Sequence, residues 1–440
     1  MLGQGFRHLG ANSMFDLIIR NATLPGGRKN MDIGVAAGRI AAVGPKLEGE
    51  AGQELDATDR LVSPPFVDAH VHMDSTLSLG LPRLNASGTL LEGIALWGEL
   101  KPQLTQEAIY ERAKKLCYWS AARGTLAIRS HVDVCDDRLL AVEALVQLKR
   151  DIAPWIDLQL VAFPQDGFYR YGKSEENLRK ALKLGLDVVG GIPHFERTME
   201  DGRLSVRALM QIAADEGRLV DMHCDETDDP LSRHIETLTA ETYRHGMGGR
   251  VAGSHLTSMH SMDNYYVSKL IPLMAEAGIA AIANPLINIT LQGRHDSYPK
   301  RRGMTRVKEL MQAGVPVGFG HDCVMDPWYS LGSHDMLEVA GMGLHVGQLT
   351  ALTEIAACFG AVTDVPARIM NLDGYGLEPG CHADLVILQA ADEMEAIRLR
   401  AERLYVIRRG KILAQSVPRE AVVHFGGETR RVDFTRGNLG

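Results

Sequence analysis

Eight short apolar runs, separated by segments with helical periodicity, constrain the fold of this chain more than any other feature. The runs are 61–72, 124–131, 156–163, 186–192, 219–223, 250–255, 279–284 and 315–320. Between them lie segments such as 139–148, in which apolar residues recur every three to four positions, as in a helix with one buried face. Because buried strands that alternate with amphipathic helices are typical of parallel sheets, eight such pairs predict a (β/α)₈ barrel of the TIM type, over residues 63–374.

Short alternating stretches near both ends of the chain predict a second, smaller domain. They are 15–20, 33–35, 38–43, 382–388 and 404–413. Each alternates apolar and polar positions beside turn-forming glycines, as strands of hairpins do. We expect residues 1–62 and 375–440 to pair into one small β-sandwich. The first dozen residues carry charge and glycine where a signal peptide has an apolar block, and are expected to be an extension.

Composition excludes several classes of partner. Lys and Arg number 47 against 55 Asp and Glu, a formal net charge of −8, and no dense basic stripe is present to neutralise a phosphate backbone. A nucleic acid polymer is therefore not an expected partner. A membrane is not expected either, because no run of 18 apolar residues exists. The six cysteines include no CxxC pair, which argues against zinc fingers and disulfide frameworks and favours a reducing, cytoplasmic location.

Chemistry in such barrels gathers at the carboxyl ends of the strands, and here those ends are rich in histidine. The motifs at these ends are His70-Val-His72, His131-Val-Asp133, Pro164-Gln165, Pro193-His194, His223-Cys-Asp-Glu226, Ser254-His255, Asn284-Pro285 and Gly320-His321-Asp322. Polar residues at all eight strand ends predict one active site on this face of the barrel.

His70 and His72 flank one apolar residue on a strand, so both imidazoles point to the same face and can clamp a metal ion. Two hydrogen-bonded structural histidines are the alternative interpretation. His223 and Asp322, at two other strand ends, favour the metal. Three neutral imidazoles and a carboxylate suit Zn²⁺ or Fe²⁺ and leave a position for water, so we expect one divalent ion, zinc or iron, per subunit.

A metal-dependent hydrolase also needs groups that move protons. Glu226 lies three residues after His223, where it can carry a proton from water to a leaving nitrogen, although a carboxylate on a surface loop is the alternative interpretation. His255 is expected to orient or deprotonate the water, or to join the metal ligands. Asp322 is expected to act as ligand and base at once.

Several stretches match a known family. They are 64–74, 87–94, 131–134, 152–159, 161–165, 223–226, 291–294, 319–322 and 326–329. With them the chain resembles the amidohydrolase superfamily, and within it the bacterial cytosine deaminases, over most of its length. The HxH motif is common to the superfamily, whereas Phe-Pro-Gln, His-x-Asp-Glu and Gly-His-Asp followed by Asp-Pro-Trp are more specific. The resemblance implies that metal-activated hydroxide deaminates a free pyrimidine base, cytosine or 5-methylcytosine, to uracil or thymine plus ammonia.

The resemblance also implies roles for single residues. His70, His72, His223 and Asp322 look like the ligands of a single metal, with Glu226 and His255 as the proton-handling pair. Many relatives bridge two metals with a modified lysine at the end of the fourth strand. Here that strand ends in residues 190–194 without a lysine, which argues for one metal and leaves His194 near the metal or in the pocket.

Four residues are expected to contact the base. The Gln165 amide both donates and accepts, so it can pair with the carbonyl oxygen and ring nitrogen of a pyrimidine. The backbone of Leu90 resembles a second contact to this ring, and Trp328 a wall against its face. Cytosine deaminases usually carry an acidic residue where this chain has Cys323, a smaller and less hydrated side chain. We therefore expect C5-substituted rings, such as 5-methylcytosine, to be accepted as well as cytosine or better.

Alternative activities remain open at this point. A creatinine deaminase or an N-alkylamino-triazine amidohydrolase would use the same metal, acid and glutamine. A cyclic amide hydrolase usually needs the lysine-bridged metal pair, and a non-catalytic paralogue would have lost ligands that are present here. The signature of the zinc deaminases that act on nucleic acid polymers is absent, so the expected partner is a small heterocycle. Relatives often form hexamers, which implies a homo-oligomer.

Overall fold

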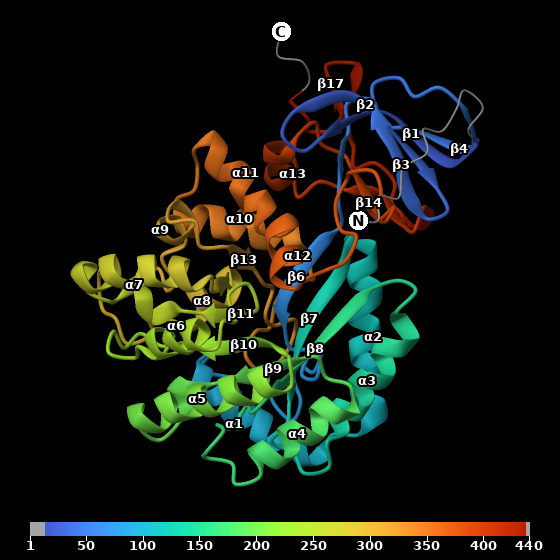
Figure 1. Ribbon diagram of the computed structural model, residues 1–440. Coiled ribbons are helices and arrows are strands. Elements are labelled where there is room, and N and C mark those ends of the chain that lie inside the picture. The colour runs from blue at the N-terminus through green and yellow to red at the C-terminus, as the bar shows by residue number, and fades with distance from the viewer. Residues whose placement is uncertain (1–13, 437–440) are drawn as a thin grey trace. The chain divides into compact units, whose positions relative to one another are not determined.

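The computed structural model describes residues 14–436, which form two compact units (Figure 1). One unit contains the described residues up to Pro65 and from Leu372 onward, and the other runs from Phe66 to Asn371. The extension expected over the first dozen residues lies outside the described range. The domain boundaries given above, 1–62, 63–374 and 375–440, stay a prediction.

The smaller unit is a mostly antiparallel β domain built from both ends of the chain. Its strands from the first part are β1 (Met14–Leu24), β2 (Arg28–Ala36), β3 (Arg39–Gly44), β4 (Glu50–Asp56) and β5 (Leu61–Ser63). Those from the last part are β14 (Leu385–Leu388), β15 (Arg403–Arg408) and β16 (Lys411–Gln415), with helix α13 (Glu393–Leu399) between β14 and β15. The sheet order is β16-β15-β14-β5-β1-β2-β3, with β4 also paired to β1. The expected pairing of the two ends is thus confirmed.

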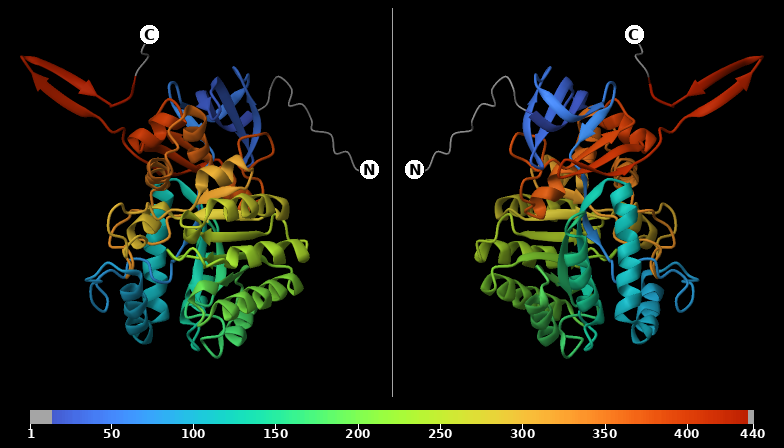
Figure 2. Two further views of the ribbon diagram at one scale, coloured as in Figure 1. Left: turned by 90° about the vertical axis from the view of Figure 1, so that its left-hand side faces the viewer. Right: turned by 90° about the vertical axis from the view of Figure 1, so that its right-hand side faces the viewer.

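The two ends of the chain meet where β5 pairs with β14, with Val62 opposite Ile387. Side chains from both ends, among them Leu17, Ile33 and Leu385, are buried in one apolar core. A two-stranded hairpin, β17 (Ala421–Phe425) and β18 (Glu428–Val432), extends away from the rest of this unit (Figure 2).

The larger unit is an eight-stranded parallel barrel. Its strands are β6 (Phe66–Val71), β7 (Thr125–Asp133), β8 (Asp157–Phe163), β9 (Val188–Gly191), β10 (Leu219–Cys224), β11 (Val251–His255), β12 (Ala280–Ala283) and β13 (Val317–Phe319). Neighbours in the chain are neighbours in the sheet. A parallel bridge between Val71 and Asp322 joins the last strand to the first. The predicted (β/α)₈ fold is therefore confirmed.

Helices pack around these strands (Figures 1 and 2). They are α1 (Leu90–Leu100), α2 (Gln106–Ala122), α3 (Leu140–Ile152), α4 (Ser174–Leu184), α5 (Met199–Asp215), α6 (His234–Arg244), α7 (Asn264–Ala277), α8 (Pro285–Leu291), α9 (Val307–Gln312), α10 (Met336–Gly347), α11 (Leu352–Gly360) and α12 (Asp364–Ile369). In α3, Val142, Leu145 and Leu148 are fully buried at the predicted helical spacing. None of the helices in the described range is long and apolar enough to cross a membrane.

One apolar run divides differently from the prediction. Residues 61–72 form two strands, β5 in the smaller unit and β6 in the barrel, and not one. Pro64 and Pro65 separate them, because proline has no amide hydrogen to donate to a neighbouring strand. The break places His70 near the end of a short strand whose six residues are all buried.

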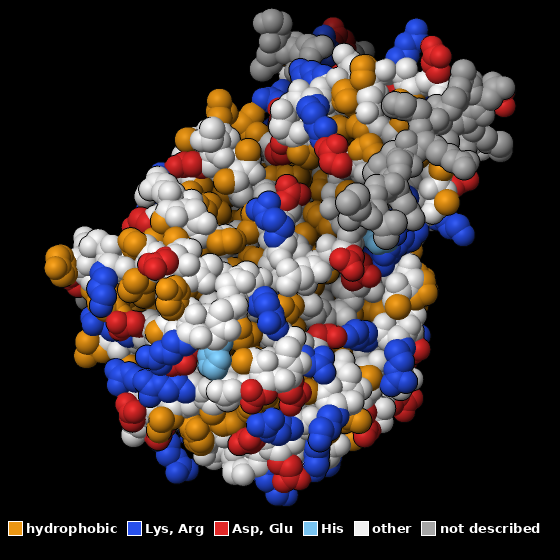
Figure 3. Space-filling view, in the orientation of Figure 1, with side chains coloured by type: hydrophobic (Ala, Val, Ile, Leu, Met, Phe, Trp, Pro, Cys, Tyr) orange, Lys and Arg blue, Asp and Glu red, His pale blue; other side chains and the backbone are white. Residues whose placement is uncertain are grey.

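The surface agrees with the weak charge bias of the sequence. On the face of the barrel that Figure 3 displays, basic and acidic side chains are interspersed and do not gather into a broad patch of one sign.

Candidate active site

The predicted metal ligands meet at the carboxyl ends of the barrel strands. His70 lies in β6, His72 directly follows it, His223 lies in β10 and Asp322 follows β13. All four side chains are buried. The structure thus brings together residues that are up to 252 positions apart in the sequence, on the barrel face where enzymes of this fold place their chemistry.

Distances within this group fit a single metal ion. Nε2 of His72 lies 3.0 Å from Nε2 of His223 and 3.4 Å from Oδ1 of Asp322, and Nε2 of His70 lies 3.5 Å from the same oxygen. In a tetrahedral site with bonds of 2.0–2.1 Å, neighbouring ligand atoms are about 3.3 Å apart. Nε2 of His70 is buried and has no hydrogen-bond partner among the described residues. Nitrogen and oxygen atoms so close together, one of them unpartnered, are what a divalent cation requires.

The protonation states of these imidazoles also suit a metal. Burial lowers the pKa of His72 to about 4 and holds the pKa of His223 well below its usual value. Burial alone would raise the pKa of Asp322, but the imidazoles of His255 and His70 hold it below its ordinary value. The rings of His72 and His223 are therefore neutral and the Asp322 carboxyl is ionised at neutral pH, which are the forms that bind metal.

Backbone contacts between the first and last strands fix His70 and Asp322 beside each other. The amide of Asp322 donates to His70 O at 2.7 Å, and the amide of His72 donates to Asp322 O at 2.9 Å. The Asp68 carboxylate reinforces this seam, because its Oδ1 accepts the amides of His70 and His321. Its Oδ2 lies 2.7 Å from Nε2 of His334.

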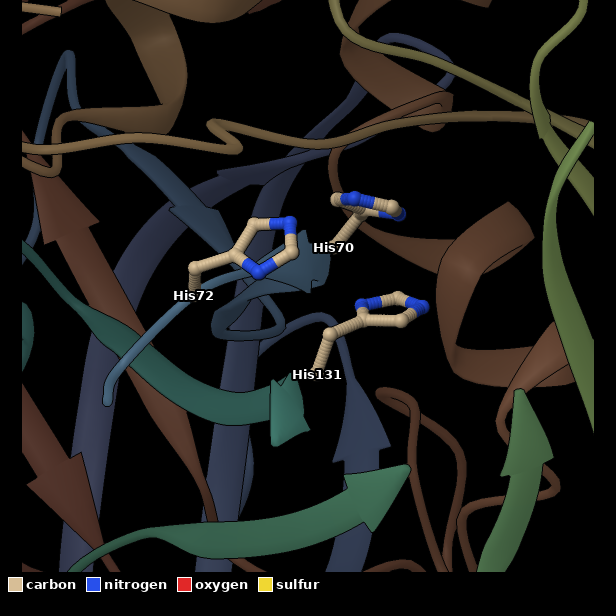
Figure 4. Close-up of side chains that lie close together, drawn as sticks. All are labelled: His70, His72 and His131. Carbon is tan, nitrogen blue, oxygen red and sulfur yellow. The ribbon is translucent and has the colours of Figure 1, made fainter. Parts of the chain in front are cut away.

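His131 is a fifth residue of this cluster to which the sequence analysis assigned no role. Its ring centroid lies 4.0 Å from that of His70, and the side chains of His70, His72 and His131 lie close together (Figure 4). These three form one group able to hold an ion, and His70, His223 and His255 form another. Neither ring nitrogen of His131 has a hydrogen-bond partner among the described residues. Its strand-end position in the sequence was the available signal.

Glu226 and His255 lie next to the ligands and next to each other. Nδ1 of His255 is 3.5 Å from Oε1 of Glu226 and 3.8 Å from Oδ2 of Asp322. Burial and, second, the charge of Asp322 raise the pKa of Glu226 well above its usual value. The side-chain amide of Asn288 lies 3.0 Å from Nδ1 of His255. This arrangement places beside the candidate metal site a carboxyl that holds its proton to a higher pH than an ordinary glutamate does.

The loop after β10 is fixed by Asp225, the residue before Glu226. Oδ1 of Asp225 accepts the Ser232 hydroxyl at 2.6 Å and lies 2.8 Å from Nδ1 of His234, while Oδ2 accepts the amide of Ile235. Asp225 is fully buried and its φ of 54° turns the chain sharply after the strand. These contacts join the start of α6 to the loop that carries Glu226 and so hold the backbone next to Glu226 in place.

All four residues predicted to contact a base line one cavity, together with three of the four candidate metal ligands; His70 is not part of its lining. The cavity is lined by His72, Leu90, Leu91, Ile94, Gln165, Ile192, His194, Phe195, His223, Glu226, His255, Ile287, Leu291, Asp322, Cys323 and Trp328. Polar groups are confined to the ligand side and to Gln165 and His194. Such an apolar cavity with a few convergent polar groups is typical of a small-molecule site.

The sequence analysis missed most of the apolar wall. Cys323 packs in a buried cluster with Ile287 and Leu291, against which Leu90 and Trp328 also lie. Ile287 and Leu291 belong to α8, a short helix that follows the strand-end motif Asn284-Pro285. That motif and the family-like stretch 291–294 were the sequence signals for these two residues, and neither specified which side chains face the cavity.

Helix α1 brings Leu90 and Trp328 together. Gly93 in this helix is required there, because a Cβ at this position would overlap the Trp328 indole ring. Trp97, one turn later, donates its Nε1 hydrogen to Oδ2 of Asp133 at 2.8 Å. The helix is thereby anchored to the end of β7, and Trp328 packs against it at the cavity.

Comparison with known proteins agrees with this geometry. A solved 5-methylcytosine deaminase from Klebsiella pneumoniae, liganded with phosphonocytosine, is 43% identical and superposes with a TM-score of 0.89 over 93% of this chain and 100% of that one. The N-isopropylammelide isopropyl amidohydrolase of Pseudomonas sp. (strain ADP) is 31% identical over 408 residues, 91% of this chain and 98% of the relative. The pterin deaminase of Rhizobium rhizogenes is 29% identical over 421 residues, 91% of this chain and 94% of the relative.

A family comparison matches residues 53–414 to the amidohydrolase family. That range includes the whole barrel and every residue of the histidine and carboxylate cluster described above. The expected resemblance is thereby confirmed: the chain belongs to the amidohydrolase family.

Proposed function

We propose that this chain is a deaminase of free pyrimidine bases, which converts cytosine, 5-methylcytosine or both, with water, to uracil or thymine and ammonia. One observation carries the proposal: a single cavity combines three of the four candidate metal ligands, His72, His223 and Asp322, with Glu226, Gln165 and an apolar wall around Cys323. The 43% identity with a 5-methylcytosine deaminase over nearly the whole chain supports the same assignment.

We assign His70, His72, His223 and Asp322 as ligands of one divalent ion, zinc or iron. Such an ion would supply an activated water as the nucleophile near neutral pH. The short distances between the ligand atoms and the neutral state of the imidazoles support this assignment. The ring of His131 lies 4.0 Å, centroid to centroid, from that of His70, and its Nε2 lies 3.8 Å from Oδ1 of Asp221.

Glu226 and His255 handle the protons of the reaction in this proposal. Hydrolysis needs one proton on the ring nitrogen as water adds to the ring carbon, and another on the leaving amine as the carbon–nitrogen bond breaks. The raised pKa of Glu226 suits a carboxyl that takes a proton from water and passes it to these nitrogens in turn. His255 lies beside both Glu226 and Asp322, where it would orient or deprotonate the water, and Asp322 would assist as a base.

Recognition of the base rests on a polar edge and two apolar faces. We propose that the Gln165 amide pairs with the carbonyl oxygen and a ring nitrogen, and that the backbone of Leu90 contacts the same ring. Trp328 lies against the ring face. A buried amide left without partners by the wrong ligand costs free energy, so Gln165 selects for rings with this edge.

Cys323 is the residue that would admit a C5 substituent. It is buried between Ile287 and Leu291, and burial raises the pKa of its thiol well above the usual value, so it stays uncharged. A methyl group beside such a wall meets no hydrated charge. We therefore expect 5-methylcytosine to react at a rate comparable to cytosine or faster.

The test is product release by metal-reconstituted protein from a panel of substrates. The panel contains cytosine, 5-methylcytosine, isocytosine, creatinine and N-isopropylammelide, with ammonia measured for the first four and isopropylamine for the last. Turnover of the two cytosines supports the proposal. Activity restricted to creatinine or to the triazine would refute the pyrimidine assignment while leaving the metal site in place.

An N-alkylamino-triazine amidohydrolase is the second candidate, favoured by the 31% identity with the isopropylammelide enzyme over nearly the full length of both chains. Release of isopropylamine in the panel would identify this activity. Assembly into a homo-oligomer and a cytoplasmic location also belong to the proposal, on the basis of the family resemblance. Sedimentation of the purified protein and fractionation of cells test them.

A further inference from the structure

A buried chain of hydrogen bonds lies behind His70, on the side of its ring that faces away from Asp322. Nδ1 of His70 is 2.9 Å from the Ser254 hydroxyl, and that hydroxyl donates to Oδ1 of Asp221 at 2.6 Å. Oδ2 of Asp221 accepts Nη1 of Arg129 at 2.9 Å. All four residues are at most 1% exposed, although they come from four different strands of the barrel.

The direction of each hydrogen bond in this series determines the tautomer of His70. Ser254 has one hydroxyl hydrogen and donates it to Asp221, so toward His70 its oxygen can only accept. Nδ1 of His70 must then carry the ring hydrogen, which leaves the lone pair on Nε2. Nε2 is the buried, unpartnered atom that lies 3.5 Å from Oδ1 of Asp322.

Arg129 holds Asp221 in place at the far end of this series of hydrogen bonds. Besides the bond to Asp221, the guanidinium donates Nε to Gln159 at 2.7 Å and Nη2 to the carbonyl of Ile369 at 3.2 Å. A carboxylate that accepts a hydrogen bond from a guanidinium is fixed in orientation, and its other oxygen remains available as an acceptor. The Ser254 hydroxyl is therefore held in one orientation.

We propose that Ser254, oriented by Asp221 and Arg129, is a positioning residue that fixes the metal-binding tautomer and ring orientation of His70. This inference rests on the proposed metal site and goes beyond it, since none of these three residues lines the cavity or belongs to the ligand set. Partners of this kind orient ligand histidines, and their loss typically weakens metal binding about 10–100-fold.

The proposal accounts for an otherwise costly arrangement. Asp221 and Arg129 are charged groups in the fully buried interior of a barrel that branched apolar side chains usually fill. Their charge is balanced within the pair, and the one remaining carboxylate oxygen is used to direct Ser254. The same oxygen lies 3.8 Å from Nε2 of His131, so Asp221 faces two rings of the histidine cluster.

The experiment measures Zn²⁺ affinity of the metal-free full-length protein by competition with a chromophoric chelator. Ser254→Ala removes the acceptor for His70, and Ser254→Thr restores a hydroxyl at the same place. Ser254→Cys keeps a side chain of similar size, but its thiol is a poor hydrogen-bond acceptor. This variant is measured in place of Ser254→Ala if Ser254→Ala does not fold. Ser205→Ala is the matched control, because Ser205 is equally buried but bonds only the carbonyl of Gly202 in α5.

We expect Ser254→Ala to bind Zn²⁺ about 10–100-fold more weakly, with Ser254→Thr and Ser205→Ala close to the wild-type protein. The visible absorption of the Co²⁺-loaded Ser254→Ala protein should shift, and the KM for the base at saturating Zn²⁺ should not. Equal affinity of wild type and Ser254→Ala, or equal weakening by Ser205→Ala, would overturn the positioning role. A wild-type protein that binds no Zn²⁺ would overturn the metal site as well.

Discussion

Substitution of Cys323 by aspartate tests how the cavity accepts a C5 methyl group. Cys323 is 3% exposed and shares its cluster with Ile287, 1% exposed, and Leu291, 6% exposed. Burying one methyl group against such a wall is worth about 0.8 kcal/mol. A carboxylate at the same place holds water that the methyl group must displace, and the combined change is about 1–3 kcal/mol.

The expected result is a change in specificity. For Cys323→Asp, the ratio of kcat/KM for 5-methylcytosine to kcat/KM for cytosine should fall about 10–200-fold below the wild-type ratio. Cys323→Ala keeps the wall apolar and should leave the ratio nearly unchanged. Both rates are measured by the absorbance change on deamination, in metal-loaded proteins whose folding has been verified by circular dichroism. An unchanged ratio in Cys323→Asp would show that Cys323 does not face the C5 position, and the reasoning would be wrong.

Three more predictions concern the proton carrier, the metal and a buried acid. Glu226→Gln should bind Zn²⁺ and the base as the wild type does but lose about 10²–10⁴-fold in kcat; full activity removes Glu226 from the mechanism. Chelation of the metal should abolish activity. Zn²⁺ at 100 times its Kd should raise the free energy of unfolding by about 2.7 kcal/mol, which is measured as a higher Tm. A Tm that does not change with Zn²⁺ would contradict the proposed metal site. Burial raises the pKa of Asp326 to about 7. The folded state therefore keeps the Asp326 proton above about pH 4, where the unfolded state releases it. The stability that this bound proton contributes is lost as the pH rises toward 7. The free energy of unfolding of Asp326→Asn, measured with urea, should therefore rise relative to that of the wild type between pH 4 and pH 7, by up to about 1.4 kcal/mol per pH unit. A difference between the two proteins that does not depend on pH refutes the raised pKa.

The strands and the grouping of the candidate metal ligands could be predicted from the sequence because their signals are local. Each barrel strand is a short buried run, and a period of two places the side chains of His70, in β6, and His72, directly after it, on the same side. His223 and Asp322 follow from the rule that catalytic groups lie at carboxyl ends of barrel strands.

Features that depend on contacts between distant residues could not be predicted in this way. Asp68 and His334 are 266 residues apart, and nothing near either one indicates their bond. The direction of the Ser254 hydroxyl depends on Asp221, 33 residues away in another strand. The apolar wall depends on how α8 is rotated about its axis, which a seven-residue helix with a largely buried sequence does not specify.

The division of residues 61–72 between two units shows a different limit. Hydrophobicity alone marks the segment as one run, and the structure separates it at Pro64 and Pro65. The prolines were visible in the sequence, and their lack of amide hydrogens was the physical reason to expect a break.

The most direct test of the central claim is the identification of the product that Zn²⁺- or Fe²⁺-loaded protein forms from 5-methylcytosine. The account predicts thymine and an equal amount of ammonia, at a rate comparable to uracil formation from cytosine and dependent on the added metal. Absence of thymine and uracil, while isopropylamine is released from N-isopropylammelide by the same preparation, would contradict it.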